Sequence, residues 1–492
     1  MGRVVAIDAG TTGVRALAVD EGGSITHVAY RELTQHFPQP GWVEHDPEEI
    51  WAHVKATLAE VASKLDDRPI AIGITNQRET VVAWDRRTGN PLHRAIVWQD
   101  RRTADRCREL QDEGHLDEVR ATTGLVLDPY FSATKMEWLL RNGDLGTTDP
   151  GRLALGTVDA WVLWKLTGGT FATDVSNASR TLLFDIHERE WSAELADLFG
   201  VSLESLPEVL PTCGHFGEAV EEAVPALAGV TIGGVAGDQQ AALFGQACFE
   251  RGMAKATYGT GSFVLSNVGP ACPAPSEGLV TTIAWDLGEF GRGPVYALEG
   301  STFVSGAAIQ WLRDNLGIIE RSEELGPLAA SVPDAGGVTF VPAFTGLGSP
   351  WWDPAARGTV LGLTRGAGRA QLARAVVESI AYSVRAMVDA MADAAVAPTV
   401  LRADGGAAAM DLLLQLQANQ VGIPVARPVS VESTALGAAM LAGLTGEVWG
   451  SLEDLVGLWH LEAEFTPEPE RATADAAYTT WLRTVERSRG WA

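Results

Sequence analysis

Two short turns rich in glycine and threonine are the residues of this sequence best suited to do chemistry. The first reads DAGTTG over residues 8–13, and the second reads YGTGS over residues 258–262. Glycine lets a backbone approach an anion closely, successive N–H groups can point at one oxygen, and threonine hydroxyls add donors. Asp8 adds a carboxylate of the kind that Mg²⁺ prefers, often through water. The turns predict a phosphate site, with an ordinary hairpin as the alternative for each.

A third glycine-rich segment, Asp404-Gly405-Gly406, precedes another predicted helix. The common nucleotide and hydrolase signatures are missing from the sequence. It has no Gly-Lys dipeptide and hence no Walker A loop, and it has no G-x-G-x-x-G, G-x-S-x-G or H-E-x-x-H pattern. Phosphate handling therefore falls to the glycine-rich turns.

Each turn lies between two predicted strands. The apolar run Val4–Ile7 enters the first turn, and Val14, Ala16 and Ala18 alternate with other residues after it. Residues 255–267 repeat the order of strand, turn and strand. This internal echo predicts two halves built on one plan.

Strand-like and helical patterns alternate along the chain. A helical stretch over residues 47–65 precedes a strand over residues 70–76, and a second strand-rich section opens at residues 235–239. Residues 371–391 carry apolar side chains every three or four positions, which predicts a helix with one buried face. The cluster GPACPAPSEG over residues 269–278 predicts a surface loop. The alternation indicates α/β architecture.

Length and composition describe a well-cored globular protein of two or three domains. The chain has 492 residues, of which 46% are hydrophobic and 20% charged. Its net charge of −26 is spread along the chain and disfavours general binding to nucleic acid or to an anionic membrane. An anionic small ligand can still bind, because backbone N–H groups and helix N-termini supply local positive potential.

The cysteines and the N-terminus bear on the compartment. Cys107, Cys213, Cys248 and Cys272 form no C-x-x-C pair and no metal-type spacing to histidine, so we expect buried free thiols. No apolar run approaches the roughly 18 residues of a membrane helix, and no signal peptide precedes Asp8. We therefore expect a cytoplasmic protein without membrane insertion.

Longer blocks of the sequence resemble a known family. They are GITNQRET (73–80), AIVWQDRRTAD (95–105), DPYFSATKMEWLL (128–140), NASRTLLF (177–184), AGDQQAALFGQ (236–246), TYGTGSF (257–263), FVPAFTGLGSPWWDPAARG (340–358) and STALGAAMLAGL (433–444). The matches run from about Val4 to Trp491 and so cover essentially the whole chain. On these residues the sequence resembles the FGGY carbohydrate kinases, and within them the branch that phosphorylates glycerol.

The resemblance implies the actin and hexokinase fold, an α/β arrangement in which two ribonuclease-H-like domains flank an ATP-binding cleft and close over the substrate. Residues 1–245 would form the N-terminal domain, with the acceptor site and the first phosphate clip. Residues 246–492 would form the C-terminal domain, with the second clip and the adenosine pocket, and residues 456–492 would be its helical tail. Two domains on one plan account for the internal echo.

The activity that the resemblance implies is transfer of the γ-phosphoryl of Mg-ATP to glycerol, which gives sn-glycerol 3-phosphate in glycerol catabolism. Asp238 matches the catalytic base of the family, and an alcohol that attacks a phosphoryl group needs a proton acceptor. We expect its removal to cost roughly a hundredfold or more in rate. Taken alone, an aspartate before two glutamines is more often a helix N-cap.

The other matched positions divide between acceptor and nucleotide. The implied acceptor contacts are Arg78, Glu79, Trp98, Tyr130, Asp238, Gln239 and Phe263. The implied ATP or ADP contacts are Thr11, Thr12, Gly13, Arg15, Thr260, Gly306, Gln310 and Gly406, with Asp8 on the metal side. None of them is a lysine, so we expect Mg²⁺, Arg15 and backbone dipoles to carry the transition-state charge. Taken alone, Arg78-Glu79 would be a surface ion pair.

A few features depart from the family pattern. Met410 stands where the family usually has an asparagine near the adenine, and it offers no amide contacts. Gly13 stands where serine is common, and Trp351 where tyrosine is usual. Some members are inhibited by fructose 1,6-bisphosphate through a Gly-Gly-x-x-Arg loop, but residues 220–238 contain no arginine. We therefore predict that this inhibition is absent.

Two alternatives compete with glycerol phosphorylation. One is a family member that acts on xylulose, erythritol or dihydroxyacetone, against which the residues Arg78, Glu79, Tyr130 and Phe263 argue. The other is an actin-like or chaperone-like ATPase, in which Asp238-Gln239 would lack a purpose. By analogy with the family we expect a homodimer or homotetramer.

Overall fold

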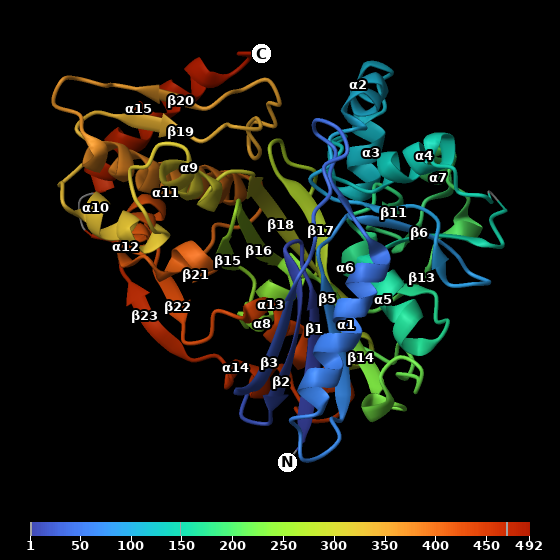
Figure 1. The fold of residues 1–492 in the computed structure, drawn as a ribbon. Coiled ribbons are helices and arrows are strands. Elements are labelled where there is room, and N and C mark those ends of the chain that lie inside the picture. Colours follow the sequence, from blue (N-terminus) through green and yellow to red (C-terminus); the bar gives the residue numbers. More distant parts are fainter. Residues whose placement is uncertain (1, 148, 469–470) are drawn as a thin grey trace.

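Two large sheets, one in each half of the chain, organise the computed structural model, which describes residues 2–147, 149–468 and 471–492 (Figure 1). The first sheet has the strand order β14-β5-β1-β2-β3. Its strands are β1 (Arg3–Ala9), β2 (Gly13–Asp20), β3 (Ile25–Glu32), β5 (Ala71–Asn76) and β14 (Thr231–Gly237). β1 pairs antiparallel with β2 and parallel with β5, and β5 pairs parallel with β14. The hairpin predicted around the first turn is therefore confirmed.

Helices α1 (Pro47–Ala62) and α5 (Val158–Thr167) pack with this sheet in one apolar core. α1 begins where the sequence predicts a helix, because the Asp46 side chain accepts from the backbone N–H of Glu48 and Pro47 occupies the first turn. Its residues Ile50, Trp51, Val54 and Leu58 are buried, and this face is the one that meets the sheet. The helix thus packs against the sheet whose strand β1 leads into the first turn.

The second sheet has the strand order β17-β18-β16-β15-β21-β22-β23. Its strands are β15 (Met253–Tyr258), β16 (Ser262–Gly269), β17 (Val280–Asp286), β18 (Pro294–Thr302), β21 (Val400–Asp404), β22 (Val425–Pro428) and β23 (Leu461–Phe465). The helix predicted over residues 371–391 is α11 (Arg369–Ala394), and its apolar face lies in the core of this half. Helices α9 (Gly306–Asp314) and α12 (Asp411–Val421) also contribute to that core.

The two sheets share one topology, as the internal echo predicts. β15 pairs antiparallel with β16 and parallel with β21, which in turn pairs parallel with β22. The same relations join β1 to β2, β5 and β14. The first turn ends β1 and the second ends β15, so the two turns occupy equivalent places in their sheets.

Helices α8 (Asp238–Gly245) and α13 (Ser433–Thr445) lie where the two halves meet (Figure 1). They pack on each other, and α13 also packs on β1, β5 and β14, although it comes from the far end of the chain. Six of the 13 residues of α13 are alanine or glycine, and at Gly437 the backbone of α8 comes too close for a Cβ atom. One buried cluster holds residues of both halves, including Val4, Leu243 and Leu441. The halves therefore share part of their core.

In the described residues, the remaining elements include a further sheet of five strands, three two-stranded sheets and the other helices. They are β4 (Glu44–His45), β6 (Val81–Asp85), β7 (Asn90–Pro91), β8 (Ala95–Ile96), β9 (Leu153–Thr157), β10 (Ala172–Asp174), β11 (Phe184–Asp185), β12 (Glu190–Trp191), β13 (Glu208–Leu210), β19 (Thr339–Val341), β20 (Thr359–Leu361), α2 (Ala104–Asp112), α3 (Leu116–Thr123), α4 (Ala133–Asn142), α6 (Val175–Ala178), α7 (Ala193–Phe199), α10 (Leu325–Ala330), α14 (Leu452–Val456) and α15 (Arg471–Ser488).

The tail expected to be helical over residues 456–492 needs a correction. It contains the strand β23 before the helix α15, because Phe465 packs against the core while the strand pairs antiparallel with the edge of β22. All four cysteines are free, with Cys107, Cys213 and Cys248 buried and Cys272 half-buried. In the described residues we find no helix with the length and apolar character needed to cross a membrane.

Candidate active site

The first glycine-rich turn is held by side chains from other strands. The N–H of Gly10 donates to the carbonyl of Gly13 at 3.0 Å, and this bond closes the turn. Nε2 of Gln77 lies 3.1 Å from the carbonyl oxygen of Gly10 and 3.2 Å from Nδ1 of His45. Nε1 of Trp98 donates to the Thr11 hydroxyl at 2.9 Å, so an aromatic of the expected acceptor set also supports the turn.

Burial affects the histidine in this support. His45 is buried at 0% exposure, and this burial lowers its pKa to about 4. Its ring is therefore neutral near pH 7, with Nδ1 free to accept a hydrogen bond from Gln77. His45 and Gln77 were not among the residues predicted for the site, because only the fold brings them to the turn.

The second turn is held by backbone groups instead. The N–H of Gly259 donates to the carbonyl of Gly261 at 2.9 Å, and the N–H of Gly306, at the start of α9, donates to the carbonyl of Gly259 at 2.9 Å. A Cβ atom at Gly261 would collide with the carbonyl oxygen of Thr302 on β18. Glycine is therefore required here by the close approach of the neighbouring strand.

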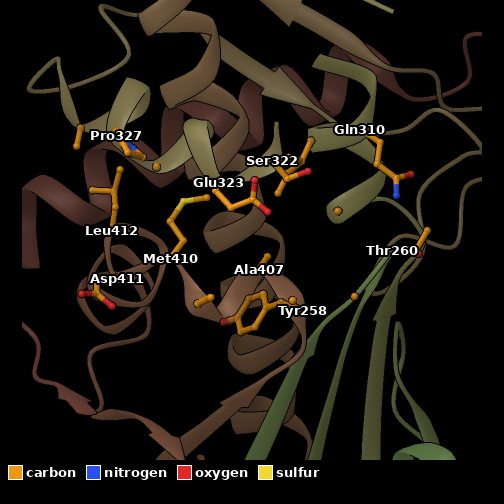
Figure 2. A pocket seen from close by; sticks show the side chains of 17 residues that line it. Tyr258, Thr260, Gln310, Ser322, Glu323, Pro327, Ala407, Met410, Asp411 and Leu412 are labelled. Carbon is orange, nitrogen blue, oxygen red and sulfur yellow. The ribbon is translucent and has the colours of Figure 1, made fainter. Parts of the chain in front are cut away.

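A cleft of about 720 Å³ opens beside the second turn (Figure 2). Four of the expected nucleotide residues line it, and they are Thr260, Gly306, Gln310 and Gly406. Apolar side chains of Ile309, Pro327, Met410 and Leu412 form part of its wall. Met410 thus lines this cleft, and its thioether offers polarisable surface but no amide hydrogen bond.

The expected acceptor residues lie together where the two halves meet. Nη2 of Arg78 donates to the Tyr130 hydroxyl at 3.2 Å, and Nε of Arg78 lies 3.2 Å from Oδ1 of Asp238. The ring of Trp98 packs edge-on against Tyr130 and against Phe263, with centroids 5.6 and 6.2 Å apart. Phe263 lies on β16 of the second half, so both halves contribute residues to this cluster.

Arg78 and Glu79 are not a surface ion pair, because they are 2% and 1% exposed. The backbone of Glu79 has φ of 60°, a conformation that is uncommon for a residue other than glycine. Burial raises the pKa of the Glu79 carboxyl, and the guanidiniums of Arg78 and Arg180 oppose that rise. The interpretation of this dipeptide as a solvated pair is therefore wrong.

Glu299 and Arg180 complete a buried ion network that the sequence did not predict. Glu299, on β18, accepts from Nη1 of Arg78 at 2.6 Å, from Nη2 of Arg78 at 3.0 Å and from Nη2 of Arg180 at 2.9 Å. Nε of Arg180 donates to Oε1 of Glu79 at 2.7 Å. Burial alone would raise the pKa of Glu299, but the two guanidiniums hold it at about 2. The network ties Arg78, from the first half, to a strand of the second.

Asp238 is the first residue of α8, and Gly237 takes the N-cap position before it. The N-cap interpretation of Asp238 is therefore wrong. Its side chain is 28% exposed, whereas that of Arg78 beside it is 1% exposed. Burial of the carboxyl raises its pKa, and the cations Arg78 and Lys255 oppose that rise. Asp238 is thus a carboxylate with an open side, held next to a fixed guanidinium.

Lys255 is a buried cation of this site that the matched positions do not include. It lies on β15, two residues before Thr257, and its ammonium donates to Oε1 of Gln239 and to the Thr257 hydroxyl. A lysine inside the otherwise apolar and small strand Met253–Tyr258 was the signal available in the sequence. Glu299 gave a similar signal, as a carboxylate in the buried part of β18.

Asp8 lies at the end of β1 and faces Arg15 across the hairpin register. Burial raises the pKa of Asp8 to about 7; Arg15 opposes this rise, and the nearby carboxylate of Asp238 adds to it. Arg15 itself pairs with Glu432, at the start of α13. Two carboxylates that disfavour each other's charge provide oxygen ligands suited to Mg²⁺. The described residues contain no group of three or more His, Cys, Asp or Glu side chains placed to hold a metal ion.

The positions that depart from the family pattern have local explanations. A Cβ atom at Gly13 would collide with the Tyr30 hydroxyl, which itself donates to the carbonyl of Thr12 at 3.2 Å. The same Cβ atom would lie 2.5 Å from the backbone oxygen of Arg31, so a serine here would need β2 and β3 to shift apart. Trp351 packs edge-on against the buried Trp481 of α15, with centroids 5.7 Å apart, so its larger ring is accommodated.

Comparison with known proteins identifies the class. The N-terminal domain model of the FGGY family of carbohydrate kinases matches residues 3–245, and the C-terminal domain model matches residues 254–445. The chain belongs to the FGGY family of carbohydrate kinases. The family resemblance of the sequence blocks is thereby confirmed.

Similar proteins include several that are named glycerol kinase. The chain is 51% identical to the glycerol kinase of Acidovorax ebreus over 497 residues, which covers 99% of each chain. It is 52% identical to the glycerol kinase of Trichlorobacter lovleyi, with complete coverage of both. The crystal structure of Plasmodium falciparum glycerol kinase with ADP superimposes with a TM-score of 0.93 at 35% identity, covering 99% of this chain and 98% of that one. The actin and hexokinase-like fold expected from the resemblance is confirmed.

Proposed function

We propose that this protein is an ATP-dependent kinase that phosphorylates glycerol to sn-glycerol 3-phosphate. The observation that carries the proposal is the meeting of three features between the two turns. They are the open carboxylate of Asp238, the fixed guanidinium of Arg78 at 3.2 Å from it, and the edge-packed rings of Trp98, Tyr130 and Phe263. The glycerol kinases that match the chain over its full length support the same acceptor.

The chemistry follows from these groups. A hydroxyl oxygen of the acceptor attacks the γ-phosphorus of ATP, the bond to the ADP oxygen breaks, and Asp238 takes the hydroxyl proton. Arg78 and Gln239 hold the other hydroxyls, because a small polyol in a closed cleft otherwise leaves buried polar groups unpaired. The aromatic rings cover its carbon chain and exclude water from the transferred group.

We propose that Asp8, with Asp238 nearby, holds Mg²⁺ through oxygen and water ligands. When bound, the ion would supply positive charge beside the phosphate oxygens, which favours breakage of the bond between the γ-phosphorus and the ADP oxygen. Thr11, Thr12, Gly13 and Arg15 on one side, and Thr260 and Gly306 on the other, direct hydroxyl, backbone and guanidinium donors toward the phosphates. Gln310 and Gly406 line the cleft for the adenosine.

Further proposals concern organisation and control. We propose two domains, residues 1–245 and 246–492, a cytoplasmic protein that works in glycerol catabolism, and assembly as a homodimer or homotetramer. Residues 220–238 have no arginine for a sugar bisphosphate, so fructose 1,6-bisphosphate should leave the activity unchanged. The test is to titrate fructose 1,6-bisphosphate into the activity assay, and strong inhibition would contradict the proposal.

The experiment that tests the function is an assay of ADP release from Mg-ATP by the purified protein. Glycerol is compared with no acceptor, xylulose and dihydroxyacetone, and each is repeated with Asp238→Asn. We expect strong stimulation by glycerol that falls roughly a hundredfold or more in the variant. Preference for another acceptor would support a different carbohydrate kinase, and turnover that ignores every acceptor would support an ATPase; either result would contradict the proposal.

A further inference from the structure

Lys255 is the buried cation of the site for which the proposed reaction has assigned no part. Its side chain is 0% exposed, and it extends from β15 of the second half to α8 at the junction of the halves. The ammonium donates to Oε1 of Gln239 and, at 2.9 Å, to the hydroxyl of Thr257. A buried ammonium costs free energy unless its hydrogen bonds and charge are matched, so these two contacts account for its place here.

Charged groups from several elements surround Lys255 and keep it protonated. Burial lowers its pKa to about 8, while the carboxylates of Asp404 and Asp238 oppose that effect; Arg78 adds to it and Glu299 opposes it. These groups come from β21, α8, the segment after β5, and β18 respectively. Because a pKa of about 8 lies above neutral pH, the side chain is mostly an ammonium there, with donors and no acceptor.

The contact with Lys255 settles which way the Gln239 amide points. A glutamine amide has an acceptor end and a donor end that are nearly equal in shape, so its neighbours decide its orientation. An ammonium can bond only to the oxygen end, which leaves Nε2 as the end available to a ligand. Over residues 2–147, 149–468 and 471–492, no hydrogen-bond partner of Nε2 is found, and Gln239 is 8% exposed next to Asp238.

We propose that Lys255 is a positioning residue of the acceptor site, which holds Oε1 of Gln239 so that Nε2 donates to a hydroxyl oxygen of the acceptor. The inference rests on the proposed function, because it needs a polyol beside Asp238. It adds a statement about specificity, namely that one hydroxyl of the polyol must accept a hydrogen bond from the protein. Without Lys255 the Gln239 amide can rotate by 180°. Its oxygen would then face the oxygen of the glycerol hydroxyl, and a hydrogen bond would form only if that hydroxyl rotated to donate.

Four variants test this proposal through the KM for glycerol. Lys255→Met removes the ammonium at similar length, Gln239→Met removes the amide, and the double variant removes both. Lys165→Met is the matched control, because Lys165 lies on α5 and its Nζ pairs with Glu48 at 2.9 Å. We expect each single variant to raise the KM for glycerol roughly tenfold, the effect of one directed hydrogen bond, with the KM for ATP unchanged. The double variant should be no worse than either single one.

Several results would overturn the proposal. If the two losses multiply in the double variant, Lys255 does not act through Gln239. If kcat falls in Lys255→Met while the KM for glycerol stays constant, Lys255 serves the phosphoryl group instead. Should Lys255→Met fail to fold, Gln239→Met still decides, because an unchanged KM for glycerol in that variant removes the step through which Lys255 would act. Failure of the proposed function is distinct, since the wild-type protein would then ignore glycerol.

Discussion

The two glycine-rich turns occupy equivalent places in their sheets, yet they are held in different ways. In the first turn, side chains of Gln77, His45 and Trp98 add to the backbone bond that closes it. Backbone groups hold the second, through the N–H of Gly306 and the close approach of Thr302. The side-chain contacts of the first turn should respond to titration and to side-chain substitution, whereas in the second turn an added Cβ atom at Gly261 would meet the backbone of Thr302.

The charges beside the turns differ as well. Asp8 stands opposite Thr75 in the register of β1 and β5, and at the equivalent place Thr257 stands opposite Asp404. Burial raises the pKa of Asp8 to about 7, and the positive charge of Arg15 offsets only part of that rise. Asp404 is held by Nε2 of Gln246 at 2.9 Å and by the Ser433 hydroxyl. We therefore propose Asp8 for the metal, whereas Oδ2 of Asp404 already accepts two hydrogen bonds.

The largest effect that we expect from this difference comes from substituting Asp8, and it is compared with substitution of Thr257 at the equivalent place in the second sheet. Asp8→Asn should lower kcat about a hundredfold and raise the Mg²⁺ concentration needed for half-maximal activity, because it removes the carboxylate on the metal side. Thr257→Val should lower kcat less than about tenfold, because Lys255 loses one bond to a neutral hydroxyl and keeps its bond to Gln239. Steady-state kinetics over a range of Mg²⁺ measures both variants. Equal losses would show that the turns are alike in function.

A second prediction concerns acid. The pKa of His45 lies at about 4 in the folded protein against 6.5 ordinarily. The unfolded state therefore binds more protons between these values, and stability is lost as the pH falls from about 6.5 toward 4. The loss attributable to His45 is roughly 3 kcal/mol when complete. Melting temperatures of the wild type and of His45→Asn, measured at pH 7 and pH 5, report the share due to this residue.

We expect the melting temperature of His45→Asn to fall less than that of the wild type between these two pH values. His460→Asn is the matched control, because His460 is exposed and should keep the wild-type dependence. An identical pH dependence in all three proteins would mean that His45 does not sense acid. The same scan shows whether the first turn, through Gln77, loses its support at low pH.

The smallest expected effect concerns volume in the turns. Gly261→Ala should destabilise the protein by about 1–3 kcal/mol and raise the KM for ATP, because the new Cβ atom meets the backbone of Thr302. In Gly10→Ala the Cβ atom would lie 3.3 Å from the carbonyl oxygen of Gly13, within its own turn, so the cost should be smaller. Thermal melting and ATP titration compare the pair. A larger loss in Gly10→Ala would reverse the distinction between the turns.

The parts of this molecule that could be predicted from sequence are local ones. Both turns, their flanking strands and the helix at residues 369–394 follow from spacing and periodicity within a few tens of residues. The shared topology of the sheets followed from the echo between the two turns. The family blocks then supplied the expected acceptor residues, which lie together where the two halves meet, and the expected nucleotide residues, four of which line the cleft beside the second turn.

The supporting residues could not be predicted, because their partners are far away in the chain. Glu299 reaches Arg78 across 221 positions, and Nε2 of Gln77 reaches the carbonyl oxygen of Gly10 across 67. The residues near a buried carboxylate in the sequence do not indicate which distant cation will form an ion pair with it. The tail strand β23 was missed for a similar reason, since its pairing depends on an open sheet edge at β22.

The measurement that tests the central claim most directly is a crystal structure of the protein with ADP, Mg²⁺ and glycerol. We expect the terminal phosphate of ADP to contact donors of both turns. We expect a glycerol hydroxyl within about 2.6–3.2 Å of the Asp238 carboxylate, the range that proton transfer requires. A nucleotide whose phosphates touch one turn only, or a glycerol seated away from Asp238, would contradict the account.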